Sequence, residues 1–135
     1  MPKRRRGSRT APLRSGRHVP FETLVERALA RTPSPFREAL AEVAIVIDDE
    51  PSPAQRIEND LPDGELLYGL YEGVPRTEYG ADWAAQPNRI TLFRLALEAD
   101  FADPLDLSEE VRITVIHELA HHLGIDDERL DELGM

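Results

Sequence analysis

Apolar positions along the first third of the chain recur with spacings that predict two helices and a strand. In residues 20–32 the apolar side chains share one helical face, and Pro20 suits the first position of a helix. A second helix is expected to begin at Pro35, with Ser34 as its N-cap, and to run to about Glu42. The short β-branched run 43–47 then predicts a buried strand.

The middle of the chain contains two further strand patterns separated by polar segments. Residues 48–62 are rich in Pro, Asp and Ser and are expected to form a loop. Residues 66–71 predict a strand, although a run this short is also compatible with a short helix. Residues 74–88 form a long irregular stretch, and residues 89–97 predict a strand whose Arg94 indicates an exposed face or edge.

The last third predicts one long helix near the C-terminus. Residues 101–107 are expected to form a connector, and Ser108 to cap a helix that runs to about Leu123. Gly124 can adopt the left-handed conformation that ends a helix, and a short last turn or helix is expected at 127–133. Helices on both sides of a few strands predict an α+β domain with a small sheet.

Charge divides the chain into a basic start and an acidic remainder. Seven of the 16 Lys and Arg lie in residues 1–18 without any acid, so residues 19–135 carry nine basic and 26 acidic residues, a net charge of −17. We expect residues 1–18 to be a flexible tail and residues 19–135 to form one domain. The tail could contact nucleic acid or an acidic partner, but the acidic body makes nucleic acid an unfavourable ligand.

The composition excludes several classes of site. The chain has no Cys, which rules out disulfides, Cys-bound zinc and a thiol nucleophile. The lack of Cys also fits a reducing compartment, so we expect a cytoplasmic location. No apolar run is long enough to span a bilayer, and no apolar segment follows the basic start as in a signal peptide. The oligomeric state cannot be predicted from these patterns.

The chemistry is concentrated in the predicted C-terminal helix, in the segment His117-Glu118-Leu119-Ala120-His121. Two His at positions i and i+4 share a helical face and can reach the same ion. Glu118 is rotated by about 100° from His117, which places its carboxylate beside the metal, where it can hydrogen-bond a metal-bound water. The opposite, apolar face of the helix can pack on the sheet.

Catalytic zinc sites need a third protein ligand and an open position for water. Gly124 ends the helix and turns the chain, so that Asp127, ten residues after His117, can return to the ion. Asp126 is its main competitor. A Glu ligand on a separate later helix is not expected, because only 14 residues follow His121. The spacing predicts one zinc ion held by His117, His121 and Asp127.

Residues 117–127 resemble the extended zincin motif HExxHxxGxxD, with Asp in place of the third His of metzincins. Together with residues 66–79 and 88–98, this segment is similar to the minimal zincin-like metallopeptidases, a family of small bacterial proteins. The resemblance implies a mixed sheet packed with helices and a zinc cleft under an edge strand. It also implies the same three zinc ligands and a catalytic role for Glu118. The Met-containing turn of metzincins has no counterpart, since Met135 is the last residue.

Two classes of function follow. The first is a zinc-dependent peptidase, in which Glu118 acts as general base on a metal-activated water and a peptide substrate pairs with the strand near residues 90–97. The alternative is an interaction module that keeps the zincin scaffold with weak or no catalysis and binds a protein or peptide partner. It is motivated by the absence of the second subdomain that usually walls the cleft. A third possibility is that the tail occupies the cleft of another copy.

Other side chains are candidates for smaller roles. A donor to the oxyanion of a peptidase intermediate is expected, but a structural role is favoured for each candidate: Tyr68, Tyr71, Tyr79 and Arg89. His122 points away from the ligand face and is expected at the surface or behind the ligands. Packing is favoured over a cleft role for Trp83 and Tyr79, and a solvated loop over a second cation site for residues 48–50.

Overall fold

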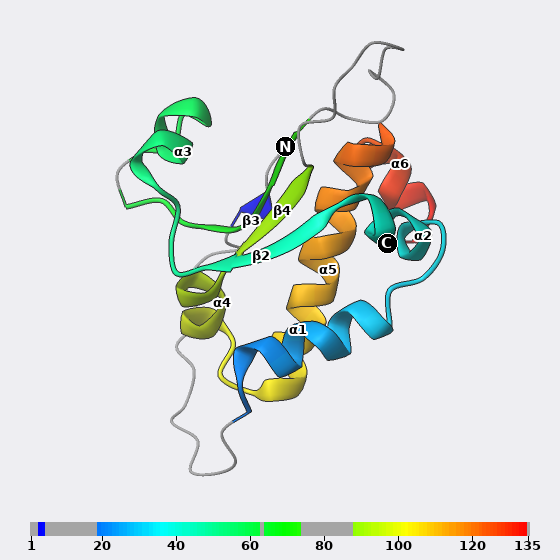
Figure 1. Cartoon of the computed structure of the whole chain (residues 1–135), viewed down its shortest axis with the longest axis horizontal. Coiled ribbons are helices and arrows are strands. Elements are labelled where there is room, and N and C mark those ends of the chain that lie inside the picture. Colours follow the sequence, from blue (N-terminus) through cyan, green and yellow to red (C-terminus); the bar gives the residue numbers. More distant parts are fainter. Residues whose placement is uncertain (1–2, 5–18, 63, 74–87, 135) are drawn as a thin grey trace.

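The computed structural model describes residues 3–4, 19–62, 64–73 and 88–134. The long helix α5, Pro104–Leu123, lies across one face of a small sheet, and α1, Phe21–Ala30, packs against it (Figure 1). The sheet has the strand order β1-β3-β4-β2, with bounds β1 Lys3–Arg4, β3 Leu67–Glu72, β4 Arg89–Phe93 and β2 Ala44–Asp48. β3 is antiparallel to β1 and β4, and β2 is parallel to β4. The α+β class and the mixed sheet are confirmed.

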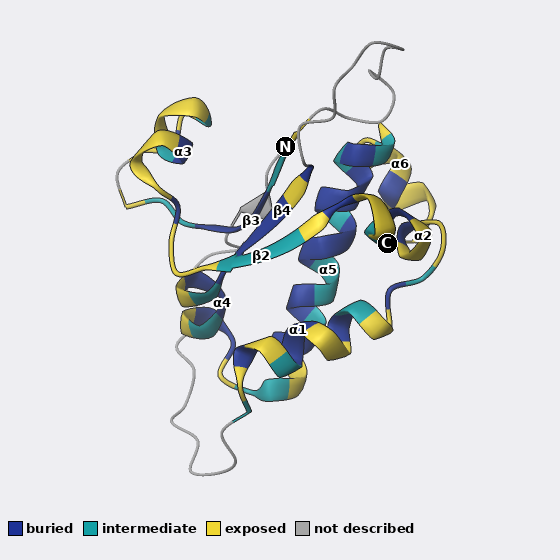
Figure 2. Ribbon diagram, in the orientation of Figure 1, coloured by how far each residue is buried: buried dark blue, intermediate teal, exposed yellow. Residues whose placement is uncertain are grey.

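Five short helical segments complete the described part of the chain: α2 Phe36–Ala39, η1 Leu40–Glu42, α3 Pro53–Glu58, α4 Arg94–Asp100 and α6 Asp127–Glu132. α2 and α6 contact α5, whereas α3 stands at the far side of the sheet and is largely exposed (Figure 2). No helix in the described ranges combines the length and the apolar character required to cross a membrane.

The hydrophobic core lies between the sheet and the pair α1–α5. Leu24 and Val25 of α1 and Val115 and Leu119 of α5 are buried there. Burial of one such side chain stabilises the fold by about 1.5–3 kcal/mol. Leu130 of α6 joins the same core, so the segment that follows α5 is anchored against the domain.

The sheet and α5 approach each other closely at Gly69. A Cβ atom at this position would lie 2.6 Å from Cγ2 of Thr114, a distance that Cβ contacts essentially never reach. The absence of a side chain at Gly69 therefore lets β3 lie directly on α5, the helix with the two candidate His ligands.

The prediction of a strand over residues 89–97 is wrong for the second half of this segment. β4 ends at Phe93, and Arg94 begins α4. A short apolar run cannot distinguish a strand from a helix by periodicity. Arg94 favours the helix through its ion pairs with Glu98, one turn later in α4, and with Asp49 (2.8 and 2.6 Å).

The predicted start of the long helix is also wrong. α5 begins at Pro104, because Asp103 is the N-cap and its side chain accepts a hydrogen bond from Leu105 N at 2.8 Å. Ser108 lies inside the helix, where it is buried and accepts a hydrogen bond from Arg31. The predicted end near Leu123 is confirmed.

Two further local predictions need correction. Residues 48–62 are not all loop, because Ser52 and Gln55 form a reciprocal capping box that starts α3. Ser34 does not cap the second helix: its hydroxyl donates to the side chain of Glu38, and the helix begins at Phe36.

Three strand and domain predictions have mixed outcomes. The strand at 66–71 is confirmed as β3. The strand at 43–47 is confirmed as β2, but its side chains are only partly buried because β2 is an edge strand. Within residues 1–18 only Lys3–Arg4 are described, as β1, so the domain boundary stays a prediction. Residues 74–87, including Tyr79 and Trp83, lie outside the described residues.

Candidate metal centre

The last two turns of α5 carry the predicted catalytic segment beside the end of β3. The side chains of His117 and His121 are 25% and 23% exposed, so both reach the surface of the domain. The side chain of Glu118 is fully buried between them and the sheet. The helix thus presents two imidazoles to solvent and holds the intervening carboxylate inside.

Gly124 ends α5 in the left-handed conformation that the sequence predicted. Its φ is 75° and ψ is 24°, and Ile125 N then donates to Ala120 O at 2.8 Å. This turn sends the chain back toward the helix. Oδ1 of Asp127 lies 3.8 Å from Nδ1 of His117, so the two side chains are neighbours across the turn.

The two adjacent aspartates have different roles in the backbone. Asp126 is the N-cap of α6, and its Oδ1 accepts a hydrogen bond from Arg129 N at 2.8 Å. Asp127 occupies the first turn of α6, and its side chain is 67% exposed. Because capping already orients the Asp126 carboxylate toward α6, Asp127 is the better placed of the two to face His117.

The Glu118 carboxylate is held by the sheet. Its Oε1 accepts a hydrogen bond from the backbone N–H of Tyr71 at 2.9 Å. The same oxygen lies 3.7 Å from Nδ1 of His121. The bond from β3 therefore fixes the carboxylate next to one of the two candidate ligands.

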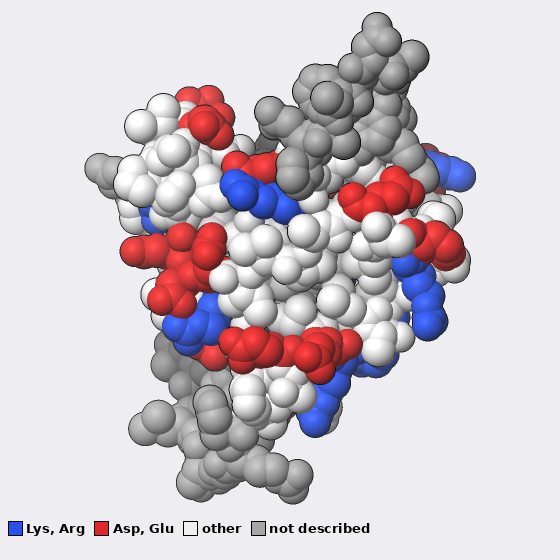
Figure 3. All heavy atoms as spheres, viewed as in Figure 1, with Lys and Arg blue, Asp and Glu red and all other residues white. Residues whose placement is uncertain are grey.

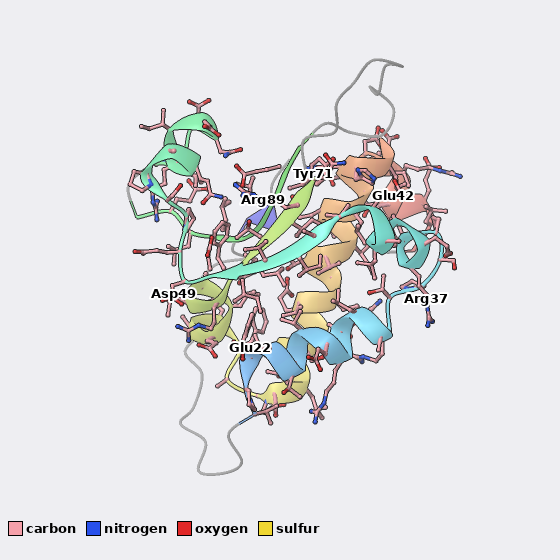
Figure 4. The ribbon with its side chains drawn as sticks, viewed as in Figure 1. Glu22, Arg37, Glu42, Asp49, Tyr71 and Arg89 are labelled. Atoms are coloured by element: carbon pink, nitrogen blue, oxygen red, sulfur yellow. The ribbon has the colours of Figure 1, made fainter. Side chains whose placement is uncertain are left out.

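Behind the ligands, His122 connects three elements. Its Nε2 lies 2.7 Å from Oε1 of Glu42, and its Nδ1 lies 3.0 Å from Oη of Tyr71. Figure 4 shows Glu42 and Tyr71 near the same end of α5. Of the two positions expected for His122, at the surface or behind the candidate ligands, the surface position is wrong, since the side chain is fully buried.

The sequence carried a signal for the burial of His122 but none for its partner. His122 follows Val115 and Leu119 by seven and three residues, which places it on the buried stripe of α5. Glu42 lies 80 residues away in the chain, and no local pattern links the two. Together, Glu42 and His122 hold the side chain of Tyr71 and so fix how the end of β3 lies against α5.

The protonation state of His121 suits a metal ligand. Burial is the largest of the causes that lower its pKa to about 4; Asp127 acts in the opposite direction, and the neighbouring His117 lowers the pKa further. At neutral pH the imidazole is therefore uncharged, the form that binds a metal ion.

A pocket of about 400 Å³ opens beside these residues. Its wall combines the end of β3 with the turn between α5 and α6, and it consists of Tyr71, Gly73, His121, Gly124, Ile125, Asp126 and Asp127. The pocket gives solvent and a ligand access to His121 and Asp127.

The donor set fits zinc in its chemistry, although it is not drawn together in this structure. In residues 3–4, 19–62, 64–73 and 88–134, no three His, Asp or Glu side chains converge as a metal site. His117, His121 and Asp127 nevertheless lie around one turn and offer two imidazole nitrogens and a carboxylate. Two His and one carboxylate are an established ligand set for catalytic zinc.

The remaining described candidates have structural partners. Tyr68 is buried, and its hydroxyl donates to Asp100 at 2.6 Å. Arg89 pairs with Glu72 at 3.2 Å on the exposed side of the sheet. Asp49, in the acidic loop after β2, pairs with Arg94.

Comparison with known proteins places this arrangement in a family. No curated protein matches the chain. Among solved structures, a conserved hypothetical protein from Thermus thermophilus is similar, with 26% identity over 84% of this chain and 94% of that chain and a TM-score of 0.48. The profile of the zincin-like metallopeptidases matches residues 40–135, from η1 through the HExxH helix to the C-terminal residue. The chain therefore belongs to the zincin-like metallopeptidase family.

Proposed function

We propose that this protein is a zinc-dependent peptidase with Glu118 as its general base. One observation carries the proposal: a buried carboxylate is fixed by Tyr71 N beside His121, and His121 lines a pocket together with Asp127. Family membership supports the same reaction class.

We assign His117, His121 and Asp127 as the residues that would hold the zinc ion. The neutral state of His121 and the 3.8 Å approach of Asp127 to His117 support this assignment, as does the capping role of Asp126. When bound, zinc lowers the pKa of a coordinated water and polarises a carbonyl oxygen.

Glu118 would take the proton of the attacking water and pass it to the leaving amine. Such a base must be held in a fixed orientation, because proton transfer needs hydrogen-bond distance to the water. The N–H of Tyr71 provides this constraint by binding one carboxylate oxygen. Burial of Glu118 keeps competing solvent away from the other side of the group.

The peptide-binding strand must be reassigned. The sequence pointed to residues 90–97, but β4 is paired along its length with β3 and β2, whereas the described pairing on the outer edge of β3 involves only the two residues of β1. β3 ends at the pocket, and the Tyr71 N–H on its outer side meets Glu118. We therefore propose that a substrate pairs in extended conformation with the outer edge of β3.

A cleavage screen tests this function. Protein loaded with one equivalent of zinc is incubated with a diverse peptide mixture, and the products are identified by mass spectrometry. We expect new cleavage products that disappear with a chelator and return when zinc is restored. A protein that holds one zinc and yields no products would favour the alternative, a module that binds a protein or peptide partner.

A further inference from the structure

The outer edge of β3, which faces away from β4, has two neighbours: the side chain of Glu118 and the strand β1. Backbone N–H groups of every second residue in a strand face the same edge. The N–H of Tyr71 faces Glu118, so those of Leu67 and Gly69 face the same outer edge. In the register of the sheet, Arg4 is the partner of Leu67 and Lys3 is the partner of Gly69.

The chain's own β1 thus occupies the edge on which a substrate is proposed to dock. β1 is antiparallel to β3 and also contacts α5. We propose that the segment at Lys3–Arg4 is an intramolecular competitor, which a peptide must displace from β3 before it can reach Glu118. This inference rests on the docking edge of the proposed function.

The pairing of β1 with β3 is weak enough for a peptide to displace it. Among the described residues, β1 consists of Lys3 and Arg4, and the register shifts between them, so the described ladder with β3 is short and irregular. A pairing this short is marginal by itself. Covalent attachment raises the effective concentration of the segment at the edge, and this lets a weak contact compete with peptides in solution.

Charge adds to the attraction. Residues 1–18 carry seven positive charges, and the remainder of the chain has a net charge of −17. Groups of acidic side chains are visible on the face shown in Figure 3. Opposite charge on the two parts keeps the basic segment near the acidic domain, most strongly at low ionic strength. Backbone pairing with β3 then sets where the segment sits.

Two matched variants of the full chain separate backbone pairing from charge. Lys3→Pro with Arg4→Pro removes both N–H donors and is incompatible with the ladder. Lys3→Ala with Arg4→Ala removes the same two charges and keeps the backbone donors. We expect hydrogen exchange at Leu67 and Gly69 to accelerate about tenfold or more in the Pro variant, and to remain near the wild-type rate in the Ala variant.

Peptide binding is then measured without zinc. The probe is a fluorescent peptide that copies residues 1–10, and its affinity is read by fluorescence anisotropy. We expect binding to the Pro variant about tenfold tighter than to the wild type and to the Ala variant, because only the Pro variant frees the edge. Unchanged exchange at Leu119 shows that the core stays folded; if the double variant unfolds, Arg4→Pro alone gives the same test.

Two results would overturn the inference. One is unchanged exchange at Leu67 and Gly69 in the Pro variant. The other is accelerated exchange without tighter peptide binding, since the freed edge would then not be a docking site. Neither measurement requires turnover, so tight binding by a protein that cleaves nothing would contradict the peptidase proposal and leave this inference intact.

Discussion

The backbone N–H of Tyr71 donates to Oε1 of Glu118 across 2.9 Å, which joins the end of β3 to the helix that carries both His of the HExxH segment. The side chain of the same tyrosine is held by buried His122, at 3.0 Å, and His122 is held by Glu42. The orientation of the proposed base therefore depends on a strand, a helix and the η1 segment together.

Loss of the Tyr71 hydroxyl should affect both stability and turnover. Tyr71→Phe keeps the ring and the backbone N–H but removes the partner of a buried imidazole nitrogen, which costs about 1–3 kcal/mol. We expect a lower kcat with an unchanged zinc affinity. Tyr68→Phe is the matched control: it removes the bond to Asp100 and should lower stability alone, as read by urea unfolding and steady-state kinetics. Equal effects of the two variants on kcat would argue against a positioning role for Tyr71.

Zinc affinity should distinguish the two aspartates. Asp127→Asn should weaken zinc binding by more than the roughly 10–100-fold that loss of an outer-shell partner costs. Asp126→Asn should leave it nearly unchanged, because Asn also caps helices well and preserves the turn before α6. Competition titration with a zinc indicator measures both affinities. The reverse order of effects would make Asp126 the ligand.

A methyl group at Gly69 should destabilise the contact between β3 and α5. Gly69→Ala would place a Cβ 2.6 Å from Cγ2 of Thr114, and overpacking of this kind costs about 1–3 kcal/mol. Thr114→Ser removes that methyl group, so the double variant should recover part of the loss. Denaturant unfolding of the wild type, the two single variants and the double variant gives the coupling free energy between the two positions. Strict additivity of the changes in unfolding free energy would contradict this packing account.

Stability of the metal-free protein should depend on His121 in mildly acidic solution. The unfolded state takes up a proton near pH 6.5, whereas the folded state does so only near its pKa of about 4, which is lowered chiefly by burial. The contribution is complete above pH 6.5 and is lost as the pH falls to about 4. Urea unfolding over this range should show a steeper loss for the wild type than for His121→Asn. Parallel curves would show that the partial burial of His121 does not lower its pKa.

The parts of the molecule that the sequence predicted well are those with local causes. The spacing of His117, His121 and Gly124 follows from helix geometry, and the structure ends the helix at Gly124 as expected, with Asp127 at 3.8 Å from His117. The switch from β4 to α4 at Arg94 was missed, because a short apolar run does not distinguish a strand from a helix, and one of the two ion pairs of Arg94, with Asp49, spans 45 residues. The Glu42–His122–Tyr71 connection and the pairing of β1 with β3 are likewise non-local. Such contacts depend on the assembled sheet and leave no periodic trace in the chain.

The most direct test of the central claim is a paired measurement on the wild type and Glu118→Gln. Zinc content is determined by elemental analysis, and turnover is measured on a peptide found in the cleavage screen. We predict one zinc per chain in both proteins and a loss of turnover of at least about 100-fold in the variant, because the base that accepts the water proton is gone. Retained turnover in a zinc-loaded Glu118→Gln protein would contradict the assignment of Glu118 and the mechanism built on it.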